Sequence, residues 1–449
     1  MSQIIVKNPV RYETEEVKKE YLNRLRSYVS AGRRYKRKYE SAQMKAYEEI
    51  LSREESVQCS HGIDFYRYYL LLDVMYILAS DSVNVDPKRL NKISERHFRD
   101  FHMDAAEGRL AKVIIDAFVS QKRNMGVLID NKELSNEQEY IKLICKNYRF
   151  REKKPVRLMV TATMSAGKST FINAVTGKHI CRSQNMACTS KIHCIMNKAY
   201  EDGFSYEYDH ELILTADKEE LLNDNEYNTT DKITVGTYFD GYLNRQRIII
   251  NDSPGVNFSE NVEHREIANK MIRKKKYNLL VYVMNATQLA TNDEDEHLEF
   301  VKHSIGRTPV LFVLNKVDMF NTDEEDAESI VRRQREYLKT KGFKNPLVCP
   351  LSSRAGYLAK QFFSGNLSKF EKRELYNYVD KFEQMGLPKY YKKYFSGIQV
   401  NDETQEEKQL LKTCGLAYVE LIIKKLVTGG NVNGTNLRKV QSIPVGDKD

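Results

Sequence analysis

The chain has 449 residues, 41% hydrophobic and 30% charged, a balance typical of a helix-rich globular protein of two or three domains. It has no run of 18 apolar residues and its start lacks the apolar core of a signal peptide, so we expect a cytoplasmic protein without a transmembrane helix. The formal net charge of +9 permits attraction to anionic lipid or nucleic acid, but the charge is spread over the whole chain and identifies neither.

Residues 1–150 are predicted to form an all-helical domain, because apolar residues recur at four-residue steps in its first half. Residues 1–10 are expected to be a flexible start. The run Arg33–Lys38 has five basic residues in six; it is either a lipid or nucleic-acid patch or a solvated helix face, and the solvated face is the simpler interpretation. The predicted helices are 12–52, either unbroken or broken near Gly32, then 63–79, 87–100, 105–121 and 137–147.

From residue 151 onward apolar strands alternate with helices, which predicts an α/β fold with a doubly wound, mainly parallel sheet and helices on both faces. We expect this domain to span residues 151–428 and a flexible tail to occupy 429–449. The polar segment 200–239 is predicted to be an insertion of helix and loop. Predicted strands are 156–161, 191–198, 246–251, 278–284, 309–314 and 346–350, and predicted helices are 168–176, 259–274, 292–304, 324–341, 355–364, 368–384, 402–412 and 417–427.

The stretch Val156–Thr170 has the order of strand, loop and helix that a phosphate-binding loop requires. Its backbone N–H groups would point at an anion, and the helix would present its positive end. Lys168 is expected to reach the β- and γ-phosphates, and the Ser169 hydroxyl to bind Mg²⁺. Ala162 stands where the pattern has its first glycine, so an ordinary strand-to-helix turn is the alternative. The predicted cradle is Ser165, Ala166, Gly167, Lys168, Ser169 and Thr170.

Three further motifs follow at the ends of apolar strands. Asp252 is expected to hold Mg²⁺ through a water molecule, and the N–H group of Gly255 to sense the γ-phosphate. The Asp318 carboxylate of the Asn-Lys-Val-Asp run can accept two hydrogen bonds from guanine that adenine does not offer, so this run favours GTP over ATP. A Ser-Ser-Arg run matches a loop that closes over the base. The predicted base-binding residues are Asn315, Lys316, Asp318, Ser352, Ser353 and Arg354.

These motifs resemble those of dynamin-like GTPases, particularly the bacterial ones, over about residues 151–428. The resemblance implies Mg²⁺-dependent hydrolysis of GTP, with Thr189 binding Mg²⁺ and orienting the attacking water, and with Ser190 as the alternative residue. It also implies that Ser165 helps to bind a monovalent cation such as K⁺ when G domains dimerise. The implied catalytic residues are Ser165, Lys168, Thr189 and Gly255, and the implied metal-binding residues are Ser169, Thr189 and Asp252. The resemblance is carried by Met164–Thr170, Cys188–Ser190, Asp252–Gly255, Asn285–Glu294 and Asn315–Asp318.

Two features depart from the dynamin-like pattern and separate two hypotheses. Met164 stands where dynamins carry a glutamine that orients the water, and a thioether cannot donate a hydrogen bond. The chain also ends soon after Val427, where dynamin-like proteins continue into long stalk helices.

The first hypothesis is a self-assembling enzyme, a homodimer through its G domains that acts at an anionic membrane surface on the inner face and takes stalk helices from a protein partner. The second is a slow GTP-dependent switch whose helical domain binds a protein partner. GTP and GDP are the expected ligands of both, and nucleic acid is not expected as a partner.

The chain's seven cysteines include no Cys-x-x-Cys pair, which fits reduced thiols. A group of cysteines and histidines lies close in sequence and suggests zinc as one interpretation, but its spacing matches no common zinc site. The simpler interpretation, which we expect, is buried or partly buried side chains beside a switch loop at His179, Cys181, Cys188, His193 and Cys194.

Overall fold

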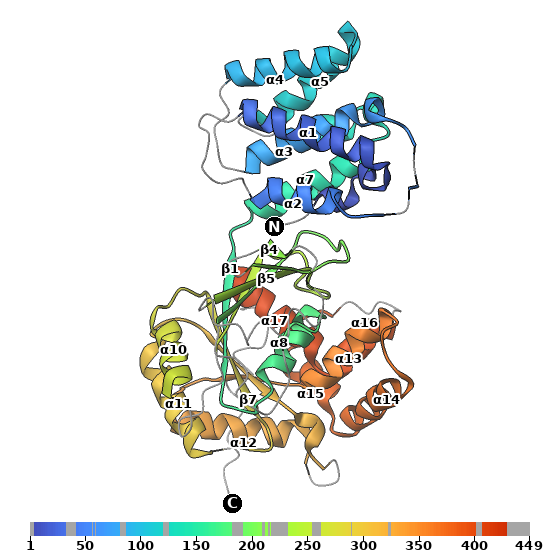
Figure 1. Ribbon diagram of the computed structural model, residues 1–449. Helices are drawn as coiled ribbons and strands as arrows, with labels where there is room; N and C mark the ends of the chain where they lie inside the picture. Colours follow the sequence, from blue (N-terminus) through green and yellow to red (C-terminus); the bar gives the residue numbers. More distant parts are fainter. Residues whose placement is uncertain are drawn as a thin grey trace, which may run out of the picture. The chain divides into compact units, whose positions relative to one another are not determined.

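The computed structural model describes residues 4–32, 42–55, 57–58, 60–80, 87–119, 125–181, 192–208, 212–213, 216, 232–253, 262–288, 290–321, 325–400 and 406–428. The basic run 33–38 and the predicted tail 429–449 lie outside these residues. The chain divides into two compact units (Figure 1). The helical unit is Met1–Glu152 with Ala199–Gly203, and the sheet unit is Lys153–Lys198 with Phe204–Asp449. Within the described ranges no helix has the length and apolar character needed to span a membrane.

The helical unit is organised around α3 (Arg67–Ser80), which is apolar on nearly every side. Its residues from Leu70 to Leu72 are fully buried, because α1 and α5 pack against it. A Cβ atom at Gly32 would lie 2.6 Å from Leu78, so glycine allows the end of α1 to touch α3. The other helices are α1 (Glu15–Gly32), α2 (Ala42–Leu51), α4 (Pro87–Asp100), α5 (Ala105–Val119), α6 (Gly126–Ile129) and α7 (Gln138–Glu152), with 3₁₀ helices η1 (Ile4–Lys7), η2 (Pro9–Tyr12), η3 (Ile63–Tyr66) and η4 (Lys132–Leu134).

A buried carboxylate joins separate segments of the helical unit. Asp73, on α3, accepts hydrogen bonds from three tyrosine hydroxyls and one side-chain amide. Burial raises the pKa of Asp73 to about 6, because the charged form loses its hydration. The donors are Tyr21 (2.6 Å), Tyr47 (2.7 Å), Tyr140 (2.5 Å) and Asn8 (2.9 Å).

The prediction of a flexible start at residues 1–10 is wrong for the described part, residues 4–10. Two 3₁₀ helices form there and bury four apolar side chains, Ile4, Ile5, Val6 and Val10. Helix α7 extends to Glu152, beyond the predicted end of this helix at residue 147. The apolar run at the start is too short to show helical periodicity, and its order depends on contacts with residues far along the chain.

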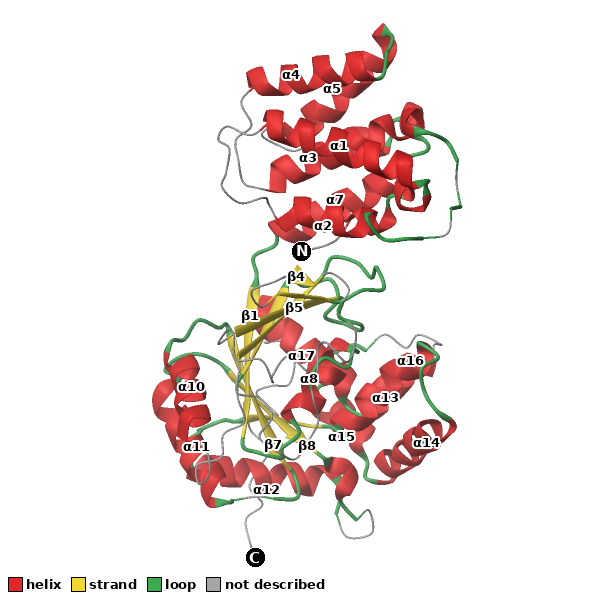
Figure 2. Cartoon of the chain, in the orientation of Figure 1, coloured by secondary structure: helices red, strands yellow, loops and turns green. Residues whose placement is uncertain are grey.

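In the sheet unit the described strands form one nine-stranded sheet in the order β4-β3-β5-β2-β6-β1-β7-β8-β9 (Figure 2). From β6 to β9 all neighbours are parallel, and β2 is parallel to β5. Strand β2 is antiparallel to β6, and β3 is antiparallel to β4 and β5. The predicted α/β fold with a mainly parallel sheet is confirmed. The strands are β1 (Val156–Ala162), β2 (Ile192–Asn197), β3 (Tyr206–Tyr208), β4 (Leu212–Ile213), β5 (Lys232–Thr237), β6 (Ile248–Asp252), β7 (Leu279–Asn285), β8 (Val310–Asn315) and β9 (Leu347–Pro350).

The prediction of helix and loop for residues 200–239 is wrong for the described part of this segment, because strands β3, β4 and β5 lie there. The ladder brings Tyr206 opposite Gly236, and a Cβ atom at Gly236 would lie 1.9 Å from the Tyr206 ring. Glycine therefore makes room for the tyrosine across the ladder. The strands are short and flanked by polar residues, and this hides their alternation in the sequence.

Helices cover both faces of the sheet. Helices α10 (Val262–Arg273) and α11 (Asn292–Ser304) lie on one side, and α8 (Lys168–Thr176) and α13 (Ser353–Phe363) lie on the other (Figure 1). All four were predicted, with boundaries within three residues of those observed. The remaining helices are α12 (Ala327–Thr340), α14 (Lys369–Gln384), α15 (Leu387–Tyr394), α16 (Glu406–Thr413) and α17 (Leu416–Thr428), of which α15 was not predicted.

An ion pair without solvent exposure fixes α13 to α17. Lys360 donates to the Glu420 carboxylate at 2.5 Å, and both side chains are completely buried. The same ammonium donates to the carbonyl oxygens of Val175 (2.8 Å) and Asp240 (2.6 Å). The second oxygen of Glu420 accepts from the N–H group of Tyr242 at 2.8 Å. This pair therefore holds the end of α8, the helix that follows the predicted phosphate loop.

Candidate functional site

The predicted phosphate loop lies between the carboxyl end of β1 and the first turn of α8, where ligands bind in such sheets. Ser165 and Gly167 have left-handed backbone conformations, with φ of +60° and +90°. Ala162 is a fully buried strand residue and is not among the residues with positive φ. Alanine is therefore compatible with this position, because the backbone there does not need the positive φ that favours glycine.

A buried ion pair lies at the start of α8. The Lys168 ammonium contacts Oδ1 of Asp252, the last residue of β6, and the two side chains are 8% and 1% exposed. Neighbouring strands bring them together, because β6 is hydrogen-bonded to β1. Asp252 therefore holds the lysine at the position where phosphates are predicted to bind.

Asn315 connects the phosphate loop with the predicted base loop. Its Nδ2 donates to the carbonyl of Ala166 at 2.9 Å, and its Oδ1 accepts from the N–H group of Ser353 at 2.9 Å. A Cβ atom at Gly167 would lie 2.3 Å from Asn315 Nδ2, so only glycine allows this approach. The sequence predicted Asn315 as a nucleotide contact, and the structure gives its side chain a bracing role.

The other predicted base-binding residues surround this brace. Asp318 lies in the 3₁₀ helix η5 (Val317–Met319), and Lys316 before it is left-handed, with φ of +65°. Ser352 caps α13 by accepting from Ala355 N at 3.2 Å. Burial, together with the nearby Asp318 carboxylate, raises the pKa of the Tyr378 hydroxyl on α14.

Arg354 is directed at α14. Its guanidinium donates to both oxygens of Glu374, at 3.0 and 2.8 Å, and this pairing raises its pKa. The Arg354 side chain therefore forms a bidentate ion pair with Glu374. Its assignment to the nucleotide stays a prediction, and it applies to the loop around Arg354.

Two of the predicted site residues, Thr189 and Gly255, lie outside the described residues. Ser165 is exposed, and Met164, Ser169 and Thr170 are partly buried. The Ser169 hydroxyl and the Asp252 carboxylate are oxygen donors of the kind that Mg²⁺ prefers, so the described part of the predicted set fits this ion.

Two side chains lie beside Asp252 that the sequence did not assign to the nucleotide site. Cys181 donates from Sγ to Asp252 Oδ2 at 3.9 Å, and burial together with the carboxylate raises the pKa of this thiol. His193 is buried directly across the ladder from Asp252. Both residues were expected to be buried beside a switch loop, but only the sheet register shows that they share a site with Asp252.

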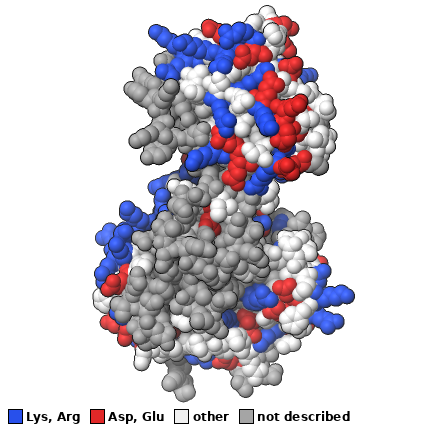
Figure 3. Space-filling view, in the orientation of Figure 1, with Lys and Arg blue, Asp and Glu red and all other residues white. Residues whose placement is uncertain are grey.

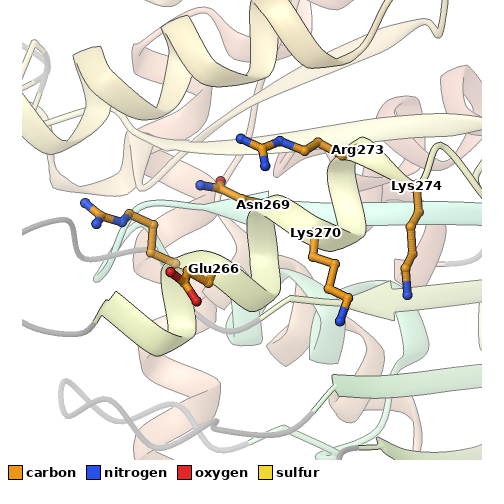
Figure 4. Close-up of a pocket in the computed structure, with 6 residues that line it drawn as sticks. Glu266, Asn269, Lys270, Arg273 and Lys274 are labelled. Atoms are coloured by element: carbon orange, nitrogen blue, oxygen red, sulfur yellow. The ribbon is translucent and has the colours of Figure 1, made fainter.

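A separate cavity of about 700 Å³ lies along α10 (Figure 4). It contains none of the predicted nucleotide-binding residues and is lined by residues of α10 and by Lys274, which directly follows this helix. Four basic side chains, one carboxylate and one amide line it: Arg265, Lys270, Arg273, Lys274, Glu266 and Asn269. On the face of the helical unit seen in Figure 3, basic and acidic side chains intermingle, which agrees with a charge that is spread over the chain.

Comparisons with known proteins identify the region around this site. The sequence model of the dynamin family matches residues 158–317, which contain the phosphate loop, Asp252 and Asn315. No match was found among curated protein sequences.

Three solved structures are reported among those that match this chain. A member of an oligomerised bacterial dynamin pair, described as sensing and tethering membranes, is 15% identical, with 96% of this chain and 64% of that chain covered and a TM-score of 0.37. Era from Aquifex aeolicus is 16% identical, with 47% and 56% covered and a TM-score of 0.29. Toc33 from Arabidopsis thaliana is 13% identical, with 66% and 94% covered and a TM-score of 0.34. The chain thus spans between half and two thirds of the length of the first two.

Proposed function

We propose that this protein contains a P-loop GTPase domain of the dynamin type and hydrolyses GTP to GDP and phosphate with Mg²⁺, because residues 158–317 match the sequence model of the dynamin family. The observation that carries the proposal is the Asn315 brace, which holds the phosphate loop at Ala166 and the base loop at Ser353. One nucleotide would then contact both loops, with its phosphates near Lys168 and its base near Asp318.

Positioning and electrostatics supply most of the catalysis in phosphoryl transfer. Lys168 would exchange the Asp252 carboxylate for the β- and γ-phosphates, and the N–H groups of residues 165–170 would donate to the phosphate oxygens. Bound Mg²⁺ would neutralise charge on those oxygens. Ser169 would hold the ion directly, together with Thr189, and Asp252 would hold it through water.

Dimerisation through the G domains is the finer part of the proposal. Ser165 is exposed in a left-handed conformation at the outer turn of the loop, so a second molecule could reach it. A monovalent cation bound there would add positive charge beside the transferred phosphate. We propose K⁺ for this position, with an anionic membrane surface and a protein partner that supplies stalk helices as further partners.

The second candidate is a slow switch, and Met164 favours it. This side chain is partly buried in the phosphate loop and cannot donate a hydrogen bond to orient water. In this version turnover stays slow at all protein concentrations, and the helical unit binds a protein partner in one nucleotide state.

The decisive experiment measures GTP turnover against protein concentration in K⁺ and in Na⁺, with and without anionic liposomes. A specific activity that rises with concentration, more in K⁺, supports the dimerising enzyme. Ser165→Ala should remove the K⁺ dependence, and Ser364→Ala, a helix-end serine of α13, should leave it unchanged. A slow and constant rate in both salts supports the switch.

Base specificity gives an independent test. Asp318→Asn replaces a carboxylate that accepts from guanine by an amide that can donate to the 2-oxo group of xanthine. We expect this variant to lose affinity for GTP and to gain affinity for XTP. Equal binding of GTP and ATP by the unaltered protein would overturn the guanine assignment.

A further inference from the structure

Three buried side chains with metal-binding atoms meet beside Lys168. Within the described residues, Cys181 Sγ, a ring nitrogen of His193 and a carboxylate oxygen of Asp252 all lie within 4.8 Å of one another. Their exposed fractions are 3%, 4% and 1%. A buried thiol, imidazole and carboxylate that lie close together form a ligand set typical of zinc.

The sheet register produces this arrangement. His193 lies directly opposite Asp252 in the antiparallel ladder of β2 and β6, and side chains of such a pair project from the same face of a sheet. Cys181 reaches the same face from the segment after α8. Its backbone is held there by Asn173, which accepts from Cys181 N at 2.9 Å and donates to Cys181 O at 2.8 Å.

The dimensions fit a tetrahedral ion. Zn²⁺ bonds of about 2.0–2.3 Å place ligand atoms roughly 3.3–3.8 Å apart. Cys181 Sγ and Asp252 Oδ2 are 3.9 Å apart, which is nearly that spacing. The remaining separations do not exceed 4.8 Å, so binding the ion requires them to shorten by no more than about 1.5 Å.

Asp252 has an oxygen for each of two partners. Its Oδ1 contacts Lys168, and its Oδ2 faces Cys181. An ion on the Oδ2 side leaves the lysine pair in place. A divalent cation there would also deprotonate the thiol and compensate the buried carboxylate charge.

We propose that the nucleotide-free protein binds one Zn²⁺ ion through Cys181, His193 and Asp252, with solvent as the fourth ligand. Mg²⁺ is disfavoured at this site, because it prefers six oxygen ligands. A second part rests on the proposed function: Asp252 is also the residue assigned to Mg²⁺, so Zn²⁺ and Mg²⁺–GTP compete for it.

The test uses the full chain, free of nucleotide, with Zn²⁺ or Co²⁺ as the only added metal. We expect one Zn²⁺ per chain in competition with a chromogenic chelator, and a thiolate-to-Co²⁺ charge-transfer band with the visible bands of a tetrahedral ion. Cys181→Ser should weaken Zn²⁺ binding at least about 100-fold and remove the band, since even outer partners of metal ligands are worth 10–100-fold.

Cys194→Ser is the matched control. Cys194 follows His193 in β2 and is also buried, but successive strand side chains point to opposite faces, so it should bind metal like the unaltered protein. Equal Zn²⁺ binding by Cys181→Ser and Cys194→Ser would overturn the site. Should Cys181→Ser fail to fold, His193→Asn and the Co²⁺ spectrum of the unaltered protein decide the question.

Competition is measured separately, by titrating Zn²⁺ with and without saturating Mg²⁺–GTP, while a fluorescent GTP analogue reports nucleotide binding. A loss of Zn²⁺ affinity in Mg²⁺–GTP supports the second part. An unchanged Zn²⁺ affinity with nucleotide bound overturns it. A protein that binds Zn²⁺ but no nucleotide would refute the proposed function and leave the zinc site standing.

Discussion

Two buried lysine–carboxylate pairs in the sheet unit share one chemistry but differ in their surroundings. Lys360 donates to three oxygens, and Glu420 accepts from the lysine and from a backbone N–H group. Lys168, by contrast, donates within the described residues to a single side chain, Asp252. This difference indicates a structural role for Lys360 and a ligand-binding role for Lys168. The three N–H donors of Lys360 are all used within the protein, whereas Lys168 keeps N–H donors for a phosphate group.

The largest expected effect on stability comes from breaking the buried pair of Lys360 and Glu420. Lys360→Met leaves Glu420 charged and buried, and removing one partner of a buried pair costs about 3–5 kcal/mol in the free energy of unfolding. Chemical denaturation measures this loss. Lys393→Met is the control, because Lys393 also pairs with a glutamate at 2.9 Å but is 60% exposed. Its loss should be much smaller, because an exposed ion pair contributes little to stability, and equal losses in the two variants would contradict the comparison.

Breaking the incompletely bonded pair should affect activity more than stability. Lys168→Met removes the charge assigned to the β- and γ-phosphates, so we expect GTP turnover to fall about 10²–10³-fold. The loss in unfolding free energy should be smaller than for Lys360→Met, because one contact is lost instead of three. Lys178→Met, at the other end of α8, should keep normal turnover. Full activity of Lys168→Met would remove Lys168 from the mechanism.

The phosphate loop could be predicted from sequence because its signal is local. Lys168 and Ser169 follow an apolar strand and begin a helix, and the structure places them in that order. The strand-end positions of Asp252 and Asn315 are likewise confirmed.

What sequence could not show depends on pairing between distant segments. Asn315 donates to Ala166, 149 residues away, and this gives it a bracing role that its sequence position did not show; its contact with the base stays a prediction. His193 meets Asp252 only because β2 runs antiparallel to β6 in one register. The burial of residues 4–10 depends in the same way on Asp73, which accepts from Asn8 across 65 residues.

Substitution of Asn315 tests whether the phosphate loop and the base loop depend on each other. Asn315→Ala leaves the N–H group of Ser353 and the carbonyl of Ala166 without their buried partner, at a cost of about 1–3 kcal/mol. We expect GTP affinity to fall by roughly one order of magnitude, measured by equilibrium titration with a fluorescent analogue. Asn366→Ala, an exposed amide, should change nothing. Normal GTP affinity in Asn315→Ala would show that the two loops assemble independently.

A buried polar group with few partners is not by itself a sign of function, and His97 in the helical unit shows this. Neither ring nitrogen has a hydrogen-bond partner among the described residues, and the ring packs against Tyr28 and Phe101. Burial lowers the pKa of His97 from 6.5 to about 3, although Asp100 acts in the opposite direction.

This burial predicts a pH effect on stability that is small near neutrality. Between pH 6.5 and pH 3 the unfolded chain binds a proton at His97 that the folded chain does not, so stability falls as the pH falls through this window. From pH 7 to pH 5.5 the loss should be about 1 kcal/mol, and His97→Leu should lack this part of the slope. His303→Gln, at an exposed position on α11, should keep the slope of the unaltered protein. We expect GTP turnover at pH 7 to be the same in His97→Leu and in the unaltered protein. If stability depended on pH with the same slope in both proteins, the folded chain would accommodate the imidazolium, and the prediction would be wrong.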